Sequence, residues 1–358
     1  MRTVMRTIAL AIAALCLATP VSSQWLNEKT PGIPRRADGT PDLTAPAPRT
    51  ADRKPDFSGV WRIPLHPGYL ANVAADLDPA DVQPWAAQLF SERMRRLGRD
   101  DPGTIGCQPI GPRHFTGGGL TETARIIQTP SVIAILYEDL TYRQIFMDGR
   151  KLPADSPYPS FMGYSVGRWE GDELVVESTG FNDLTWLDFG GHPHTEALRI
   201  VERYRRVNFG HVRRDVTLID PKTFDRTITI QGEMVLAPDT DLLEYICAET
   251  ARDRYTLQGA ATQESVEVAP ENLKKFAGVY EFSGPSPFGI RTITVLLSDG
   301  QLWASFDGKG RIPLTPLSQT MFSPRLAGTW EFIMDERGVV THLLTRSVEG
   351  TSKAARRF

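Results

Sequence analysis

The sequence has few cysteines and histidines, and it lacks an apolar run long enough to cross a membrane as a helix. Three cysteines and six histidines are spread over 358 residues. The apolar run from Ile8 to Ala18 is shorter than the roughly 20 residues that a membrane-spanning helix needs. Because histidines and cysteines are scarce, a stretch that holds two histidines among carboxylates stands out, and it is described below.

The first 23 residues have the features of an export signal. Arg2 and Arg6 form a basic start, Ile8 to Ala18 forms the apolar segment, and Val21-Ser22-Ser23 is a small-residue cleavage site. We therefore expect a periplasmic or secreted protein whose mature chain starts near Gln24. We expect no membrane insertion after the signal is removed.

An excess of basic charge is also missing. The whole chain has a formal net charge of −3, and beyond the first 23 residues it holds 38 basic and 43 acidic residues. A slightly acidic surface argues against a nucleic acid or an anionic membrane as partner. We expect a small-molecule ligand as the partner, and the oligomeric state stays open.

After signal removal, Cys107 and Cys247 are the cysteines that remain. In an oxidising compartment, two cysteines with no others favour one disulfide. Two buried free thiols are the alternative.

The order of segments predicts two β domains. We expect residues 24–55 to form an extended arm and residues 56–257 to form a first β domain. Residues 258–270, which are polar and small, fit a linker to a second β domain at 271–358.

Short apolar or alternating runs separated by tight-turn signals predict that both domains are antiparallel. Asp148-Gly149 and Asp299-Gly300 are examples of these signals. Such a meander closes readily into a barrel. One helix is expected, between Asp78 and Gly98, near the N-terminus of the first domain.

The two domains open with similar stretches, Asp56-Phe57-Ser58-Gly59-Val60-Trp61 and Lys275-Phe276-Ala277-Gly278-Val279-Tyr280. A Gly-x-Trp at the first strand, followed by a β meander and a late arginine, resembles the calycin or lipocalin class. In that class the aromatic residue closes one barrel end and an arginine from the last strand packs across it. The resemblance implies two antiparallel calycin/lipocalin-like barrels. Arg252 or Arg254 would serve the first barrel, and Arg356 or Arg357 the second.

Two further resemblances cover most of the chain. Residues 271–358 resemble the lipocalin-like module often appended to β-lactamase-related hydrolases. Residues 54–255 resemble a large, mostly uncharacterised family of exported bacterial proteins, in phrases such as PDFSGVW, CQPIGPR, GYSVGRWEGDELVVESTGFND and EYICAE. These phrases include Cys107 and Cys247, which strengthens the expectation of a disulfide, but the resemblance carries over no settled activity.

The stretch from Phe181 to Arg206 concentrates groups that can transfer protons. Two histidines, three carboxylates and a tryptophan lie between Phe181 and Glu196. A histidine titrates near neutral pH, and a carboxylate behind it fixes its tautomer and raises its basicity. We expect His194 to be the general base and Asp188 to orient it. His192 and Glu196 are the candidates for the acid.

The expected function is an acid–base lyase or isomerase that acts, without a cofactor, on an aromatic or amphiphilic ligand in a barrel pocket. Tyr142 and Arg143 would steady an anionic intermediate. The remaining candidates for substrate binding are mostly aromatic, since aromatic residues at a barrel mouth make good pocket walls. They are Trp186, Tyr164 and Trp169, together with Asp183.

Other interpretations stay open. A non-catalytic binder is the common use of a lipocalin-like barrel. A metal-dependent hydrolase would hold a divalent metal between His192, His194 and Glu196, although Gly190, Gly191 and Pro193 interrupt the alternation that would align these ligands. The same polar residues can instead simply fix their loop through hydrogen bonds.

Two sequence motifs that resemble catalytic ones are interpreted as structural. Gly163-Tyr164-Ser165-Val166-Gly167 matches a nucleophile elbow, but a hairpin follows it where the elbow needs a helix. Glu202-Arg203-Tyr204-Arg205-Arg206 favours a structural ion-pair network on a strand over a substrate carboxylate site.

Overall fold

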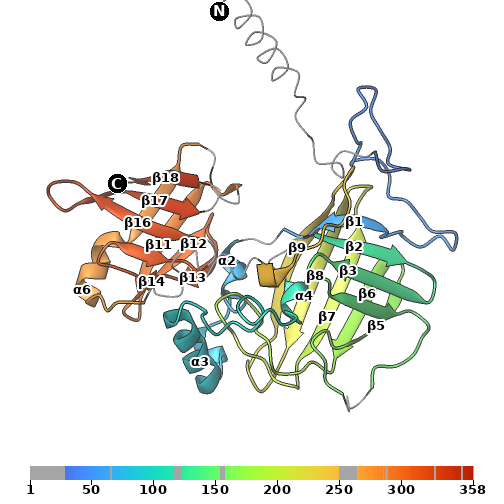
Figure 1. Cartoon of the computed structure of the whole chain (residues 1–358), viewed down its shortest axis with the longest axis horizontal. Helices are drawn as coiled ribbons and strands as arrows, with labels where there is room; N and C mark the ends of the chain where they lie inside the picture. The colour runs from blue at the N-terminus through green and yellow to red at the C-terminus, as the bar shows by residue number, and fades with distance from the viewer. Residues whose placement is uncertain are drawn as a thin grey trace, which may run out of the picture.

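Two nine-stranded sheets dominate the computed structural model (Figure 1), and the prediction of a mainly β protein with two barrel-like, mostly antiparallel sheets is confirmed. The structure describes residues 29–64, 67–116, 123–153, 158–249, 264–284, 286, 289–325, 328–347 and 350–357. The expected signal peptide, residues 24–28 of the arm, residues 258–263 of the linker, Arg252 and Arg254 lie outside these ranges.

The first sheet is a closed barrel in which each strand pairs with the next along the chain. Its strands are β1 (Gly59–Arg62), β2 (Thr123–Gln128), β3 (Val132–Tyr137), β4 (Tyr142–Phe146), β5 (Tyr164–Glu170), β6 (Glu173–Thr179), β7 (Arg199–Arg206), β8 (His211–Ile219) and β9 (Ile228–Leu236). β9 returns to β1 through Trp61 opposite Leu236, which closes the barrel. All pairs are antiparallel except β4 with β5, which is parallel and short, with Ile145 opposite Ser165.

The second sheet has the strand order β13-β12-β11-β10-β18-β17-β16-β15-β14. Its strands are β10 (Gly278–Phe282), β11 (Thr292–Ser298), β12 (Gln301–Phe306), β13 (Lys309–Pro313), β14 (Thr315–Pro316), β15 (Met321–Ser323), β16 (Thr329–Met334), β17 (Val340–Ser347) and β18 (Gly350–Arg357). The first strand, β10, therefore lies inside the sheet, between β11 and the last strand, β18.

Between β1 and β2 the chain forms α2 (Pro67–Leu70), the 3-10 helix η1 (Pro79–Asp81), α3 (Pro84–Arg95) and α4 (Arg113–Thr116). The expected helix is α3. It begins at Pro84, whose fixed backbone suits the first turn, and it buries Ala86, Phe90 and Met94, which share one face. It ends at Arg95, and Leu97 and Gly98 then adopt a left-handed backbone with φ 54° and 65°. Two short segments, α6 (Pro270–Leu273) and η2 (Lys274–Phe276), precede β10.

Both sheets begin with the same local arrangement. The indole Nε1 of Trp61 donates to the carbonyl of Phe57 at 2.8 Å, and the hydroxyl of Tyr280 donates to the carbonyl of Phe276 at 2.7 Å. In both cases the donor lies four residues after the acceptor, so the aromatic ring folds back over the barrel end.

An arginine completes each arrangement. Arg356 of β18 donates to the carbonyls of Lys275 and Ala277, at 3.0 and 2.6 Å. In the first barrel the arginine over the Trp61 ring, 4.9 Å from its centroid, is Arg206 of β7. Arg252 and Arg254, which were expected in this role, lie outside the described residues.

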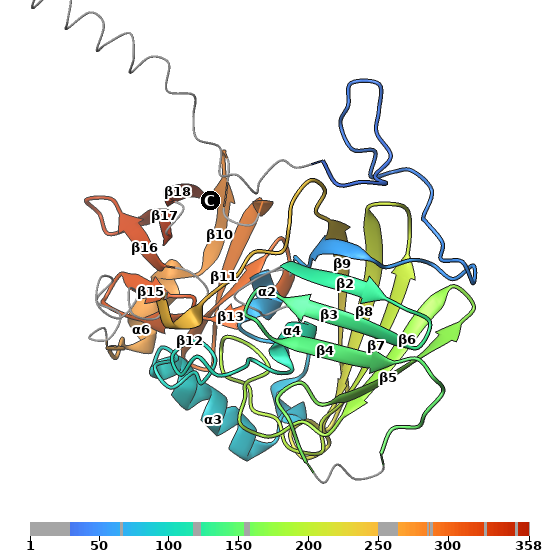
Figure 2. The ribbon, with the colours of Figure 1, turned by 45° about the vertical axis from the view of Figure 1, so that its right-hand side comes forward.

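The helical segment between β1 and β2 lies between the two sheets (Figure 2). Ala71 belongs to the apolar core of the second sheet. The amide of Asn72 donates to the carbonyl of Arg311 at 2.9 Å, and the hydroxyl of Thr315 donates to the carbonyl of Met94 at 3.2 Å. These contacts fix the edge of the second sheet against the loops at one end of the barrel.

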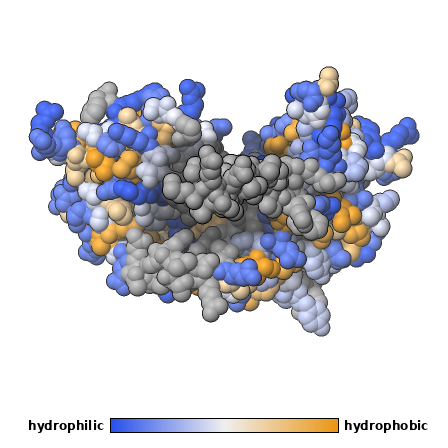
Figure 3. Space-filling view, turned by 45° about the horizontal axis from the view of Figure 1, so that its top comes forward, coloured by the Kyte–Doolittle hydropathy of each residue, from blue (hydrophilic) through white to orange (hydrophobic). Residues whose placement is uncertain are grey.

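The predicted disulfide is confirmed. Cys107 and Cys247 are bonded with their Cα atoms 5.5 Å apart. The bond ties the helical segment to the chain that follows β9. On the face shown in Figure 3, apolar side chains form patches separated by hydrophilic ones. No helix in the described part of the chain is both long enough and apolar enough to cross a membrane.

Candidate functional site

Asp188 organises the loop that connects β6 to β7. Its carboxylate is fully buried and accepts backbone N–H bonds from Val73 at 2.8 Å, Gly191 at 2.8 Å and His192 at 3.1 Å. The ring Nδ1 of His192 lies 2.5 Å from the same carboxylate. Four donors therefore converge on Asp188, and they fix both the loop and the orientation of the His192 ring.

The electrostatics of this pair determine which nitrogen of His192 carries the proton. Burial would raise the pKa of Asp188, but the neighbouring His192 and the backbone donors outweigh it and lower that pKa. Asp188 is thus an anion that only accepts hydrogen bonds, so Nδ1 of His192 must hold the proton. In the neutral ring this leaves the lone pair on Nε2, the form that a general base requires.

The free edge of His192 borders a cleft between the two sheets. Its ring stacks on Phe90 of α3 with 3.8 Å between centroids. Nε2 has no hydrogen-bond partner among the residues that the structure describes. The cleft has a volume of about 200 Å³, and His192 lines it together with residues of α3 and of β12 and β13.

The second sheet contributes a cation to this cleft. The guanidinium of Arg311 lies over the Trp303 ring, 5.2 Å from its centroid, and Nη2 is 3.4 Å from the carbonyl of Leu77. Its Nε is buried and has no partner in the described structure. Phe90 and Met94 add apolar wall. The cleft thus combines the His192 ring, the Arg311 cation and an apolar surface with the carboxylate of Asp299, which also lines it.

The structure pairs Asp188 with His192, and not with His194 as expected. Nε2 of His194 lies 2.8 Å from the hydroxyl of Thr185, and its Nδ1 lies 3.3 Å from the carbonyl of Thr195. Burial lowers the pKa of His194. His194 is therefore a neutral, fully bonded ring that holds the loop in shape.

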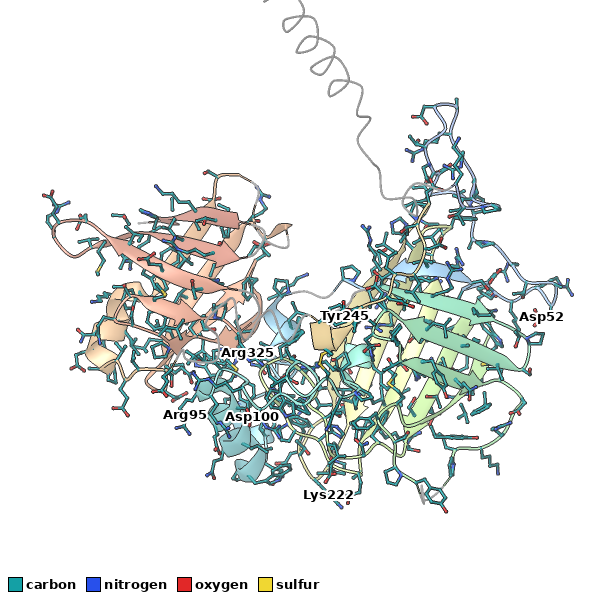
Figure 4. The ribbon with its side chains drawn as sticks, in the orientation of Figure 1. Asp52, Arg95, Asp100, Lys222, Tyr245 and Arg325 are labelled. Carbon is teal, nitrogen blue, oxygen red and sulfur yellow. A yellow bond between two sulfur atoms is a disulfide. The ribbon has the colours of Figure 1, made fainter. Side chains whose placement is uncertain are left out.

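The other acidic candidates lie away from His192. Glu196 is exposed and pairs with Lys222, which lies at the lower edge of the barrel in Figure 4. Asp183 is also exposed. The triplet of His192, His194 and Glu196 therefore does not converge. The described residues contain no group of three or more His, Cys, Asp and Glu side chains that could hold a metal ion.

Tyr142 and Tyr164 line a different cleft, of about 500 Å³, where β4 and β5 diverge. Tyr142 is exposed, and the hydroxyl of Tyr164 accepts a bond from Arg150 at 2.9 Å. His192 is not among the residues that line this cleft. Arg143 also lines this cleft and His194 does not, so the structure separates the expected base from three of the expected substrate-binding residues.

The two candidate tryptophans are packing residues in this structure. Trp186 is buried beneath the guanidinium of Arg93, which lies 4.6 Å from the ring centroid. Trp169 stacks on Phe57 with 6.0 Å between centroids.

Arg143 lies inside the first barrel, in a polar network that the sequence indicated only in part. Its Nε donates to Ser165 at 2.9 Å, and its Nη2 donates to Ser178 at 2.7 Å and to Glu202 at 2.5 Å. The hydroxyl of Tyr204 donates to the other oxygen of Glu202 at 2.5 Å. Ser165 therefore serves the network and has no nucleophile role, and Glu202 forms the expected structural ion pair, although with Arg143.

Several residues of these sites were not predicted from the sequence. Arg214 of β8 lies inside the barrel, and its position between Val212 and Val216 in an alternating strand was the available signal. Arg311 and Trp303 carried no such signal, because they reach the His192 cleft from another sheet.

No protein-family model matches the chain, and no curated protein matches it.

Proposed function

We propose that the protein is an acid–base enzyme, a lyase or an isomerase, which acts on a small organic anion in the cleft between the two sheets. His192 is the general base, and Asp188 orients it. The observation that carries the proposal is the buried Asp188–His192 pair, whose Nε2 edge faces a cleft that also holds an arginine. This replaces His194 by His192 in the role expected from the sequence.

The residues that line the cleft would have distinct roles in the reaction. Arg311 would pair with the anionic group of the ligand, while Phe90 and Met94 hold its apolar part. Nε2 of His192 would then take a proton from the carbon next to a carbonyl or carboxylate group. Asp188 stabilises the imidazolium that forms, as a buried carboxylate does behind a catalytic histidine. The same nitrogen returns the proton to another carbon, or to a leaving group, so no further reactant is needed.

Export is part of the proposal. The first 23 residues predict it. The disulfide between Cys107 and Cys247 supports it, because disulfides persist in oxidising compartments.

Proton exchange with solvent tests the chemistry without knowledge of the substrate. The protein is incubated in D₂O with a panel of small carboxylates and keto acids, and NMR follows the replacement of carbon-bound hydrogen by deuterium. We expect exchange in at least one compound with the wild-type protein. His192→Gln should reduce the rate by a factor of about 100 or more, the range typical of a lost general base.

His194→Gln is the matched control, since it changes a buried histidine two residues away that does not line the cleft. It should retain exchange, and far-ultraviolet circular dichroism verifies that both variants fold. Equal exchange by the wild-type protein and by His192→Gln would sink the catalytic proposal. If a panel compound binds in the cleft and the wild-type protein exchanges none of its hydrogens, the protein is a non-catalytic binder.

A further inference from the structure

The cleft between the two sheets is lined by charged groups of both signs. Among the described residues that line it, the charged side chains besides His192 are Arg311 and Asp299. Arg311 lies on β13, and Asp299 lies in the tight turn between β11 and β12. One guanidinium and one carboxylate in the same cleft are complementary to a ligand that carries one charge of each sign.

Neither charge is paired within the described part of the protein. Asp299 accepts a hydrogen bond from the hydroxyl of Ser298 at 2.9 Å but forms no ion pair with a described residue. Arg311 forms none either, and its buried Nε has no hydrogen-bond partner in those ranges. A buried donor without a partner costs free energy, so a ligand acceptor at Arg311 is stabilising. A simple anion would satisfy Arg311 and leave Asp299 unpaired.

The two charges lie at different points along β12. The Arg311 guanidinium lies over the Trp303 ring, 5.2 Å from its centroid, and Trp303 is four residues beyond Asp299. At about 3.3 Å per residue of strand, the two charges are separated by on the order of 10 Å. The ammonium and the carboxylate of an α-amino acid are attached to one carbon, so they cannot reach both groups. A chain with one charge at each end can.

The rest of the lining is largely apolar. Phe90 and Met94 of α3 contribute to it, as do Leu77 and Val82 from the segment before α3. The cleft volume of about 200 Å³ equals that of roughly seven water molecules at about 30 Å³ each. A short unbranched methylene chain suits this small space, because apolar walls favour apolar groups and a branched ligand needs more room.

We propose that the cleft binds a linear ω-amino acid, with its carboxylate on Arg311, its ammonium on Asp299 and its methylene chain along Trp303. This inference rests on the proposed function in that it uses the same cleft, and it names the substrate class for that function. The carbon next to the ligand's carboxylate carries the hydrogen that the proposed reaction removes.

Calorimetry on the chain from Gln24 onward, with both sheets present, tests the site with 6-aminohexanoate as the probe. Three matched compounds each change one feature. Hexanoate lacks the ammonium, hexylamine lacks the carboxylate, and the isomer 2-aminohexanoate has both charges at one end. We expect 6-aminohexanoate to bind at least tenfold more tightly than each of the three, because it alone forms a charge-assisted pair at both ends.

Variants at the two charged residues assign the two ends of the ligand. Asp299→Asn removes the negative charge and keeps the turn, because asparagine also tolerates the left-handed backbone, φ 52°, at this position. It should weaken binding of 6-aminohexanoate at least tenfold and leave binding of hexanoate unchanged. Arg311→Met should weaken both. Asp148→Asn is the control, since it alters another Asp-Gly turn that does not line this cleft, and it should bind like the wild-type protein.

The proposal is overturned if the wild-type protein does not bind 6-aminohexanoate, if it binds 2-aminohexanoate equally tightly, or if Asp299→Asn binds the probe with unchanged affinity. Asp299 is exposed, so this variant tests the site even if Arg311→Met fails to fold. Deuterium exchange separates this inference from the proposed function. Binding of 6-aminohexanoate without exchange of its carbon-bound hydrogens removes the catalysis and keeps the ligand class. Exchange in another carboxylate, with no binding of 6-aminohexanoate, does the reverse.

Discussion

The two sheets start from the same arrangement and enclose different interiors. In each, an aromatic residue bonds to the carbonyl four residues earlier, and an arginine reaches the neighbouring backbone carbonyls. Inside the second sheet the rings of Phe276, Phe322 and Phe332 pack with centroids 4.6 to 5.5 Å apart. The first barrel instead encloses a network of buried polar and charged side chains around Arg143 and Glu202.

The two interiors differ in how much they contribute to the stability of the protein. An apolar interior stabilises a fold through burial alone, whereas buried charges stabilise it poorly and often cost free energy. Among the described residues of the second sheet, the buried polar side chains are Thr315 and Thr345. We infer that the second sheet is built for packing and lends its edge, with Arg311, to the His192 cleft.

The largest expected effect follows from loss of the disulfide, which lies in the first part of the molecule alone. Cys107 and Cys247 are 140 residues apart in sequence, so the double serine variant should lose about 5 kcal/mol in the chain-entropy model. Amide hydrogen exchange should rise throughout β1 to β9 and stay low in β10 to β18. Equal loss of protection in both sheets would show that they unfold as one unit, and the comparison would fail.

A second effect separates the two kinds of ion pair. Glu202→Leu leaves two uncompensated arginines in the barrel and should cost about 3–5 kcal/mol in urea unfolding. The second sheet offers a matched pair on its surface, Glu331 with Arg346 at 2.6 Å. Because that pair is exposed, Glu331→Leu should cost no more than about 1 kcal/mol.

The double variant Arg143→Met/Glu202→Leu serves as the internal control. It removes both charges of the buried pair and should recover much of the stability that Glu202→Leu loses. If the double variant is as unstable as the single one, the loss comes from packing and not from charge.

The sequence allowed the strands and their inward faces to be predicted. Leu198, Ile200, Glu202 and Tyr204 alternate along one segment, and the structure buries all four. Period-two alternation and tight-turn dipeptides are local signals, so they can be recognised in the sequence without knowledge of the fold. The helix at Pro84–Arg95 was found in the same way.

The partners within the candidate sites could not be predicted, because they depend on contacts between distant segments. Gly190, Gly191 and Pro193 break the alternation of side chains along the loop. The spacing of the residues in the sequence therefore did not show that Asp188 bonds to His192 and that His194 bonds to Thr185. Nor did a local pattern indicate that Arg311 would approach His192, or that β4 and β5 would pair in parallel.

The smallest expected effect is on the pH dependence of stability. It tests whether a buried histidine makes the first barrel more sensitive to acid than the second sheet. Burial lowers the pKa of His194 in the folded state, so below about pH 6.5 the unfolded chain binds a proton that the folded protein does not. Stability should therefore fall as the pH drops from about 6.5 to the folded pKa, by at most about 1.4 kcal/mol per pH unit for this one group. His194→Gln should flatten this slope in urea unfolding measured at pH 7, 6 and 5. His342→Gln should flatten it less, because His342 in the second sheet lies nearer to solvent, although burial lowers its pKa as well. Equal slopes for the wild-type protein and His194→Gln would place the acid sensitivity elsewhere and remove this distinction between the two sheets.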